Sequence, residues 1–263
     1  MAQEKLAAQL YTVREFTQNA KDLAESLKKI QAIGYPAVQT SAISADIPDA
    51  DIKAMADDCG LIICNTHVRP SEALWNDIDA VIKQHQIWDC KHAAIGSMPK
   101  EFREEGEDGF KRFAAEGSKI GEQLAAAGMT FSYHNHSFEL VKYGNRTGLD
   151  IIYDDSDPRY LQAEIDTYWI QHGGADPAAW IARMKNRMPA VHLKDMAVVP
   201  GEGARGEQIM AEIGEGNHNW AAILQACRDI GVEWYVVEQD TCQRDPFESL
   251  KISYDNLQTL LSE

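Results

Sequence analysis

Four segments of this 263-residue chain each end on a residue type that binds metal ions. The segments read YHNHSFE, AEID, AVHLKD and YVVEQD, and they place Glu139, Asp166, His192 and Glu238 where predicted strands run out. An apolar run leads into three of the segments, whereas the first is more polar. These residues are far apart in sequence, so only a fold that gathers strand ends around one point can bring them together. A (β/α)8 barrel does so, because its active site is built from the C-terminal ends of its strands.

The residue types restrict the metal. Three carboxylates and one imidazole without thiolates disfavour a structural zinc site. They favour a catalytic Mn²⁺ ion, with Mg²⁺, Co²⁺ or Zn²⁺ as alternatives. Each residue also has an ordinary structural interpretation. Asp166 precedes Thr-Tyr-Trp and could cap the next helix, and His192 could be a hydrogen-bonded core histidine. The metal interpretation therefore rests on the four residues together.

Strand-like and helix-like segments alternate along the chain. Apolar residues at helical spacing predict a helix over Ala20–Ile33, and Gly34 supplies its stop. Further helices are expected at Phe110–Ala127, Asp176–Met188 and Trp220–Ile230. Eight strand-like segments are Leu6–Thr12, Ala37–Ser41, Leu61–Val68, His92–Ser97, Met129–His134, Leu161–Asp166, Ala190–Leu193 and Trp234–Glu238.

This alternation implies a parallel sheet. Eight strands in a chain of this length predict an α/β fold, a single (β/α)8 TIM barrel that spans 1–263 as one domain. A doubly wound open sheet is the alternative, but no GxGxxG motif or P-loop follows the first strand. The polar, glycine-rich stretch Val198–Gly216 is expected to be a long loop after the seventh strand.

Composition narrows the function classes. A net charge of −16 argues against a nucleic-acid partner, because phosphate contacts need a basic surface. No window approaches the roughly 18 consecutive apolar residues of a membrane span. The N-terminal sequence lacks a basic start followed by an apolar core, so no signal peptide is expected. Five cysteines without CxxC spacing favour reduced thiols and a cytoplasmic location. The sequence leaves the oligomeric state open, including a homo-oligomer.

The succession YHNHSFE, EIDTYW, HLKDM, GEG and VVEQD resembles the sugar phosphate isomerase/epimerase superfamily, the xylose-isomerase-like barrels. The resemblance runs from about Leu6 to Leu261, and the last four strands carry its specific part. It implies one divalent metal ion held by Glu139, Asp166, His192 and Glu238. It also implies that Glu139 and Glu238 form an acid/base pair on opposite faces of a carbohydrate substrate.

The implied chemistry is isomerisation or epimerisation of a sugar or sugar phosphate. It begins with removal of a proton next to a carbonyl, through a metal-stabilised enediolate. Further residues are expected to contact the substrate, although each could instead have a structural role. For example, Lys194 could merely pair with Glu164 or Asp195. The expected substrate-binding residues are His67, His134, His136, Trp169 and Lys194.

Three other functions deserve comparison. Endonuclease-IV-type nucleases share the barrel but need three zinc ions and more strand-end histidines. Here strand four ends in Ile95-Gly96-Ser97-Met98, and Trp169 stands where the nuclease pattern has histidine. Metal-dependent lyases or dehydratases acting on keto-sugars, 3-keto-glycosides or inososes would use the same first step and the same site. A catalytically silent sugar-binding barrel is disfavoured by the complete ligand set.

Overall fold

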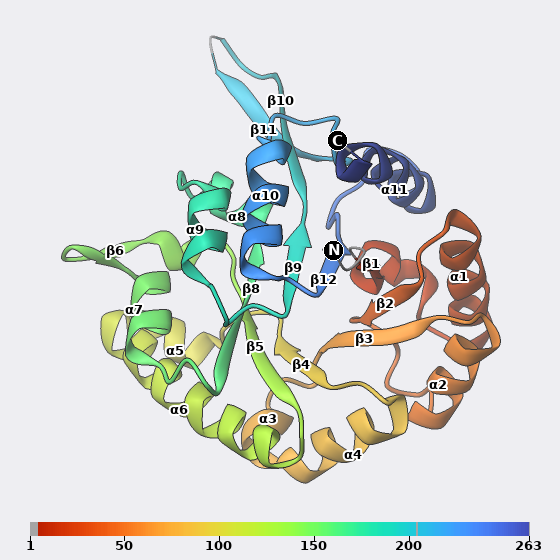
Figure 1. The fold of residues 1–263 in the computed structure, drawn as a ribbon, viewed down its shortest axis with the longest axis horizontal. Coiled ribbons are helices and arrows are strands. Elements are labelled where there is room, and N and C mark those ends of the chain that lie inside the picture. The colour runs from red at the N-terminus through yellow and green to blue at the C-terminus, as the bar shows by residue number, and fades with distance from the viewer. Residues whose placement is uncertain (1–4, 204, 263) are drawn as a thin grey trace.

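The structure is a computed structural model that describes residues 5–203 and 205–262, and eight of its strands close into a parallel barrel (Figure 1). Around the barrel the strands follow the order β1-β12-β9-β8-β5-β4-β3-β2, so each lies beside the barrel strand that precedes or follows it in the chain. The predicted (β/α)8 barrel is confirmed. Its strands are β1 (Lys5–Gln9), β2 (Ala37–Thr40), β3 (Ile62–His67), β4 (His92–Ile95), β5 (Thr130–His134), β8 (Leu161–Asp166), β9 (Ala190–Leu193) and β12 (Trp234–Val237).

Helices surround this barrel (Figure 1). They are α1 (Ala20–Ile33), α2 (Asp49–Asp58), α3 (Ala73–Asn76), α4 (Ile78–Trp88), α5 (Lys100–Glu104), α6 (Glu107–Ala126), α7 (Gly148–Asp155), α8 (Thr167–His172), α9 (Pro177–Arg183), α10 (Trp220–Ile230) and α11 (Pro246–Ser262), with the 3-10 helices η1 (Leu10–Phe16) and η2 (Phe138–Leu140). Among the described residues, no helix combines the length and apolar character needed to cross a membrane.

Strand parity sets which side chains reach the barrel interior. Successive side chains of a strand point to opposite faces, so on β8 Glu164 and Asp166 share the inner face, while Ile165 joins the hydrophobic core. The register places Asp166 of β8 beside His192 of β9. Two strand ends that are distant in sequence thus present ligand-type residues at the same height.

The first strand is shorter than predicted. The segment Leu6–Thr12 was expected to be extended, but β1 ends at Gln9 and η1 begins at Leu10. The Gln9 side chain caps this 3-10 helix by accepting the backbone N–H of Tyr11 at 3.4 Å. The local hydrogen bond competes with strand extension, and the apolar pattern does not reveal it.

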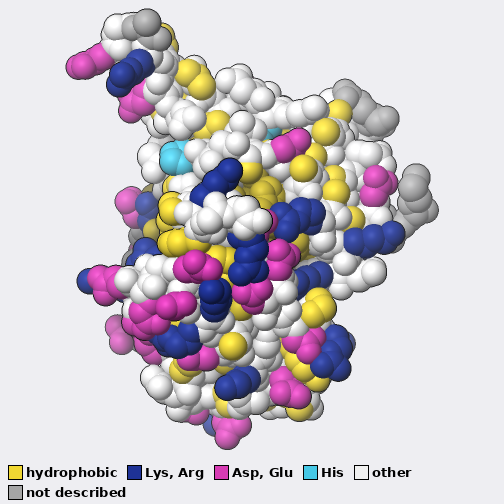
Figure 2. All heavy atoms as spheres, turned by 90° about the vertical axis from the view of Figure 1, so that its left-hand side faces the viewer, with side chains coloured by type: hydrophobic (Ala, Val, Ile, Leu, Met, Phe, Trp, Pro, Cys, Tyr) yellow, Lys and Arg dark blue, Asp and Glu magenta, His cyan; other side chains and the backbone are white. Residues whose placement is uncertain are grey.

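The stretch Val198–Gly216 is not a simple loop, which corrects the sequence-based expectation. Strands β10 (Asp195–Pro200) and β11 (Gly206–Ala211) pair in antiparallel fashion. The hairpin projects from the body of the barrel in both Figure 1 and Figure 2. Figure 2 also shows acidic and basic side chains intermingled over the body below the hairpin. The extended pairing satisfies backbone groups that a loop would leave to water.

Asp195 anchors the base of this hairpin. Its buried carboxylate accepts the backbone N–H groups of Gly214 at 2.9 Å and Gly216 at 3.1 Å, and the indole N–H of Trp220 at 2.7 Å. The His218 ring contacts its other oxygen at 2.7 Å. The polar glycine-rich sequence that follows β11 is therefore a turn wrapped around one carboxylate.

We expect Asp195→Asn to lower the free energy of unfolding by about 2–3 kcal/mol, because an amide cannot accept on both sides. Thermal unfolding measures the change, with the exposed Glu207→Gln on β11 as the matched control. A melting temperature equal to that of the control would show that the carboxylate contributes no such stabilisation.

Candidate metal centre and active site

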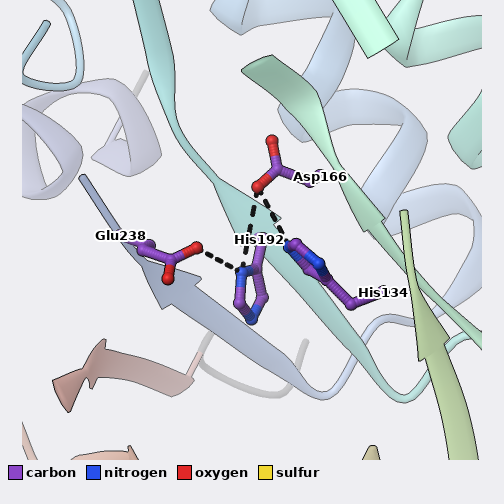
Figure 3. A group of neighbouring side chains, drawn as sticks. All are labelled: His134, Asp166, His192 and Glu238. Atoms are coloured by element: carbon purple, nitrogen blue, oxygen red, sulfur yellow. Dashed lines mark hydrogen bonds and ion pairs between the residues drawn. The ribbon is translucent and has the colours of Figure 1, made fainter. Parts of the chain in front are cut away.

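Four buried side chains converge at the C-terminal end of the barrel: His134, Asp166, His192 and Glu238 (Figure 3). His134 Nε2 lies 3.2 Å from Asp166 Oδ2, and His192 Nδ1 lies 3.0 Å from Glu238 Oε2. His192 Nδ1 is 3.9 Å from Asp166 Oδ2. One donor atom from each residue lies within 4.8 Å of the others, a spacing that could hold a metal ion. We call these four residues the ligand cluster.

Asp166 caps the next helix, as one interpretation of its sequence predicted, and it also belongs to the ligand cluster. Its Oδ1 accepts the backbone N–H of Trp169 at 3.0 Å and caps α8. Its Oδ2 faces the ligand cluster. The cap fixes the orientation of the carboxylate, so the second oxygen is already aimed at the other ligand-type residues.

Lys194 lies fully buried among carboxylates. Its Nζ is 3.0 Å from Asp166 Oδ2, 2.9 Å from Glu238 Oε2 and 2.8 Å from Asp240 Oδ2. These contacts replace the predicted structural alternative, in which Lys194 would pair with Glu164 or Asp195. Burial disfavours the ammonium ion, but Asp166 and Glu238 outweigh it and raise the pKa of Lys194 well above its usual range.

The site carries more negative charge than its own cations offset. Burial raises the pKa of the Asp166 and Glu238 carboxyls, but Lys194 outweighs this effect and holds both below their usual range. Burial lowers the pKa of His192, but Glu164 and Glu238 outweigh it and raise that pKa to about 10. Lys194 and His192 thus face at least three ionised carboxylates. The donor chemistry and this charge both fit a divalent cation, which would displace the His192 proton on binding.

Glu139 lies outside the ligand cluster, and His134 is the fourth member instead. Both Glu139 oxygens accept the backbone N–H of His136, at 2.9 and 3.0 Å, and Oε1 also accepts the Tyr133 hydroxyl at 2.5 Å. Glu139 belongs to η2, where the chain turns back after β5. Burial raises the pKa of Glu139 to about 7, in the range suited to proton transfer.

Glu164 is a site residue that the sequence did not reveal as functional. Its buried carboxylate accepts the side-chain amides of Gln39 at 2.9 Å and Asn65 at 2.5 Å, and contacts His67 Nε2 at 2.7 Å. It also lies 3.4 Å from His192 Nε2. Its position two residues before Asp166 on one strand was the available signal, because that spacing puts both carboxylates on the same face.

This network sets the orientation of the His192 ring. Gln39 donates its amide N–H to Glu164, so the Gln39 Oε1 faces His192 Nε2 at 2.6 Å and accepts its proton. The remaining nitrogen, Nδ1, faces Asp166 and Glu238. Carboxylates and amides behind a histidine ligand commonly fix its tautomer in this way.

Glu164→Gln should therefore weaken metal binding about 10- to 100-fold, the usual effect of losing a partner behind a ligand. Gln cannot accept the Gln39, Asn65 and His67 donors as a carboxylate does. Calorimetric titration of metal-free protein with Mn²⁺ measures the affinity, and the exposed Glu122→Gln is the control. Equal affinities in the two variants would refute a positioning role for Glu164.

A cavity of about 870 Å³ opens beside the ligand cluster. His67, His134, His136 and Glu238 line it. His67 stacks on His192, with ring centroids 5.2 Å apart. The structure therefore places three of the five predicted substrate-binding residues on the cavity wall.

Trp169 and Lys194 stand next to these wall residues. The Trp169 ring lies 5.2 Å from the His136 ring and 5.6 Å from Lys194 Nζ. His136 Nδ1 and Trp169 Nε1 are buried and have no hydrogen-bond partner among the described residues. Burial lowers the pKa of His136 to about 3, so its ring is neutral near pH 7. Buried polar atoms without partners are uncommon, and His136 lines the cavity, so its Nδ1 suits a bound polar molecule.

Comparison with solved structures gives the same barrel. A sugar phosphate isomerase/epimerase from Parabacteroides distasonis superimposes with a TM-score of 0.76 at 24% identity, covering 98% of this chain and 94% of that one. An L-ribulose 3-epimerase superimposes with a TM-score of 0.69 at 18% identity, covering 99% and 95%. At these identities the likeness concerns the fold.

Sequence comparison identifies one related enzyme and the family to which the chain belongs. An inosose dehydratase from Geobacillus thermodenitrificans is 26% identical over 144 residues, which span 50% of this chain and 48% of the relative. The chain thus matches about half the length of that enzyme. The family model described as xylose isomerase-like TIM barrel matches residues 27–259. That match covers most of the barrel, and the protein is a member of the xylose isomerase-like TIM barrel family.

Proposed function

We propose that this protein is a divalent-metal-dependent isomerase or epimerase of a sugar, which starts by removing a proton next to a carbonyl. The observation that carries the proposal is the ligand cluster, four buried donors with surplus negative charge beside a large cavity. The family includes sugar isomerases, epimerases and dehydratases, so an enzyme of carbohydrate metabolism is expected.

We assign Asp166, His192 and Glu238 as three of the metal ligands. There are two candidates for the fourth ligand: His134, which lies in the ligand cluster, and Glu139, which the sequence implied. A divalent cation in this position would polarise the substrate carbonyl and offset charge that develops on its oxygen. Mn²⁺ is the first expectation, because the donors are oxygen and imidazole nitrogen.

Glu238 is the proposed base on one face of the sugar. It borders the cavity, and Lys194 and His192 outweigh the effect of burial and hold its pKa well below the usual range, so it enters as a carboxylate. Glu139, whose pKa burial raises to about 7, is the proposed proton carrier for the opposite face. His136 and Trp169 offer their unpartnered nitrogens to substrate oxygens, and His67 lines the same wall. Lys194 limits the repulsion between the carboxylates and supplies a cation near the substrate oxygens.

An elimination on the same site is the second candidate, because of the similarity to an inosose dehydratase. Such an enzyme also begins with proton removal beside a carbonyl. The two functions differ only in the second step, which is return of a proton in one and departure of a neighbouring oxygen in the other.

Incubation in D₂O with metal-loaded protein separates the candidates. The compounds are D-fructose, D-ribulose, 3-keto-glucose and 2-keto-myo-inositol, together with fructose 6-phosphate and ribulose 5-phosphate. Deuterium at the carbon beside the carbonyl supports the first step. An epimeric or isomeric product supports the main proposal, a dehydrated product supports the second, and absence of exchange from every compound would contradict both.

A further inference from the structure

The Lys194 ammonium contacts the same two oxygens of the ligand cluster that a divalent cation would take. Its Nζ lies 3.0 Å from Asp166 Oδ2 and 2.9 Å from Glu238 Oε2. A Mg²⁺ ion binds carboxylate oxygens at about 2.0–2.1 Å. An ion of this kind on Glu238 Oε2 would therefore lie no more than about 5 Å from the ammonium. Two cations this close in a buried site repel each other, and both need the same carboxylate oxygens.

Asp240 offers the ammonium a position outside the ligand cluster. Its Oδ2 accepts a hydrogen bond from Lys194 Nζ at 2.8 Å. Arg14 donates to the backbone carbonyl of Asp240 at 3.0 Å and so holds the base of this side chain in place. The four-carbon stem of a lysine is flexible. A small shift of Nζ can therefore break its contacts with Asp166 and Glu238 while it keeps the contact with Asp240.

The two positions differ in their relation to the cavity. Asp240 is half-buried and lines the cavity. Lys194 is fully buried and is not among the described residues of the cavity wall. An ammonium held by Asp240 alone would thus be held by a residue of that wall, beside the space where a substrate would lie.

We propose that Lys194 acts as an internal cation on the ligand oxygens, and that binding of a divalent metal transfers its ammonium to Asp240. The two residues then set the metal affinity together. Lys194 opposes the metal, and Asp240 favours it by receiving the displaced ammonium. The contact with substrate that the sequence predicted for Lys194 consequently forms only after the metal has bound. This inference rests on the metal centre of the proposed function.

Metal affinity measures the competition. Calorimetry titrates chelator-stripped protein with Mn²⁺ at about pH 8, where carboxyl protons compete least. Lys194→Met should raise the affinity about 10-fold or more, because the neutral side chain neither repels the ion nor holds its ligands. Asp240→Asn should weaken the affinity about 10-fold, because the displaced ammonium then lacks a carboxylate. The exposed Lys119→Met and Asp58→Asn are the matched controls, and both should stay within about twofold of wild type.

The double variant separates transfer of the ammonium from a simple effect of charge. In the Lys194→Met protein, Asp240→Asn should weaken Mn²⁺ binding no more than about threefold, because no ammonium remains to be received. An equal loss in both backgrounds would overturn the transfer. A Lys194→Met protein that binds Mn²⁺ no more tightly than wild type would overturn the competition.

A crystal structure of the Mn²⁺-loaded wild-type protein locates the ammonium directly. Lys194 Nζ should remain within about 3.2 Å of Asp240 Oδ2 and lie beyond about 3.5 Å from Asp166 Oδ2 and Glu238 Oε2. Retention of both contacts with the ligand oxygens would overturn the inference. This structure decides the question even if Lys194→Met does not fold.

Failure of the inference can be told from failure of the proposed function. Wild-type protein that binds no Mn²⁺ would reject the metal centre and the inference together. Wild-type protein that binds Mn²⁺, but gains no affinity when Lys194 is replaced by Met, would reject the inference and keep the metal centre.

Discussion

Replacing Glu238 by Gln is expected to lower kcat about 100-fold or more, the usual scale of a lost general base. Gln keeps the size of Glu and one oxygen but cannot take up a proton as a carboxylate does. The substitution also leaves Lys194 and His192 with one negative neighbour fewer. Turnover of the compound that exchanges fastest in D₂O measures the effect, with metal content determined on the same sample.

Glu139→Gln should give a loss of similar size, for a different structural reason. The carboxyl is buried and held by Tyr133 and the His136 N–H, so the amide keeps one acceptor and loses the titratable proton. If the two glutamates act on opposite faces of the sugar, one variant should still exchange the substrate proton with solvent while it fails to form product.

A result near wild-type turnover in either variant, with metal bound, would remove that glutamate from the proton transfers. Thermal unfolding provides the control for folding. The exposed Glu122→Gln variant supplies a matched loss of one carboxylate far from the chemistry. Loss of exchange and of product together in both variants would show that both glutamates are needed for the first proton transfer, and would contradict two bases that act independently on opposite faces.

Removal of divalent metal by chelation is expected to abolish activity, and Mn²⁺, Mg²⁺ or Co²⁺ should restore it. The ligand cluster is buried and negatively charged, so the added ion should also raise the melting temperature through preferential binding to the folded state. Elemental analysis of the stripped protein checks the loss. Full activity in protein shown to be free of metal would contradict the proposed function.

Ligand variants sharpen this prediction. His192→Ala and Asp166→Ala should each reduce metal occupancy strongly, because each removes one of few protein ligands. The exposed His172→Ala is the control for loss of a histidine. His134→Ala and Glu139→Gln then compare the two candidates for the fourth ligand, and the variant with the larger loss of metal affinity identifies it.

The pH should govern metal affinity in a defined direction. Burial lowers the pKa of His192, but Glu164 and Glu238 outweigh it and raise that pKa to about 10. A proton must therefore leave Nδ1 when metal binds near pH 7, and affinity should rise with pH up to that value. Calorimetry in buffers of different ionisation enthalpy reports the released proton. The absence of proton release would show that His192 is already neutral in the metal-free protein.

The sequence by itself determined the barrel and most of the ligand cluster. The ends of strands can be recognised from the local sequence, because apolar runs stop where polar ligand-type residues begin. Parallel strands in a closed barrel then bring those ends together, which is why Asp166, His192 and Glu238 could be grouped across more than 70 residues of chain. The same rule placed Lys194 on the inner face two residues beyond His192.

Only the tertiary structure decided what happens beyond the strand ends. Glu139 lies five residues past His134, and a turn stabilised by its own hydrogen bonds carries it out of the ligand cluster. Glu164 gains its role from Gln39 and Asn65 on other strands, and no local pattern encodes such partners. The cavity takes Ile43, Trp88, Asp49 and Glu72 from loops and helices of the first half of the barrel, whereas Glu238 and Asp240 follow its last strand. Side-chain contacts between distant segments depend on packing in three dimensions, whereas periodicity along the chain reports only which face of its own element a residue occupies.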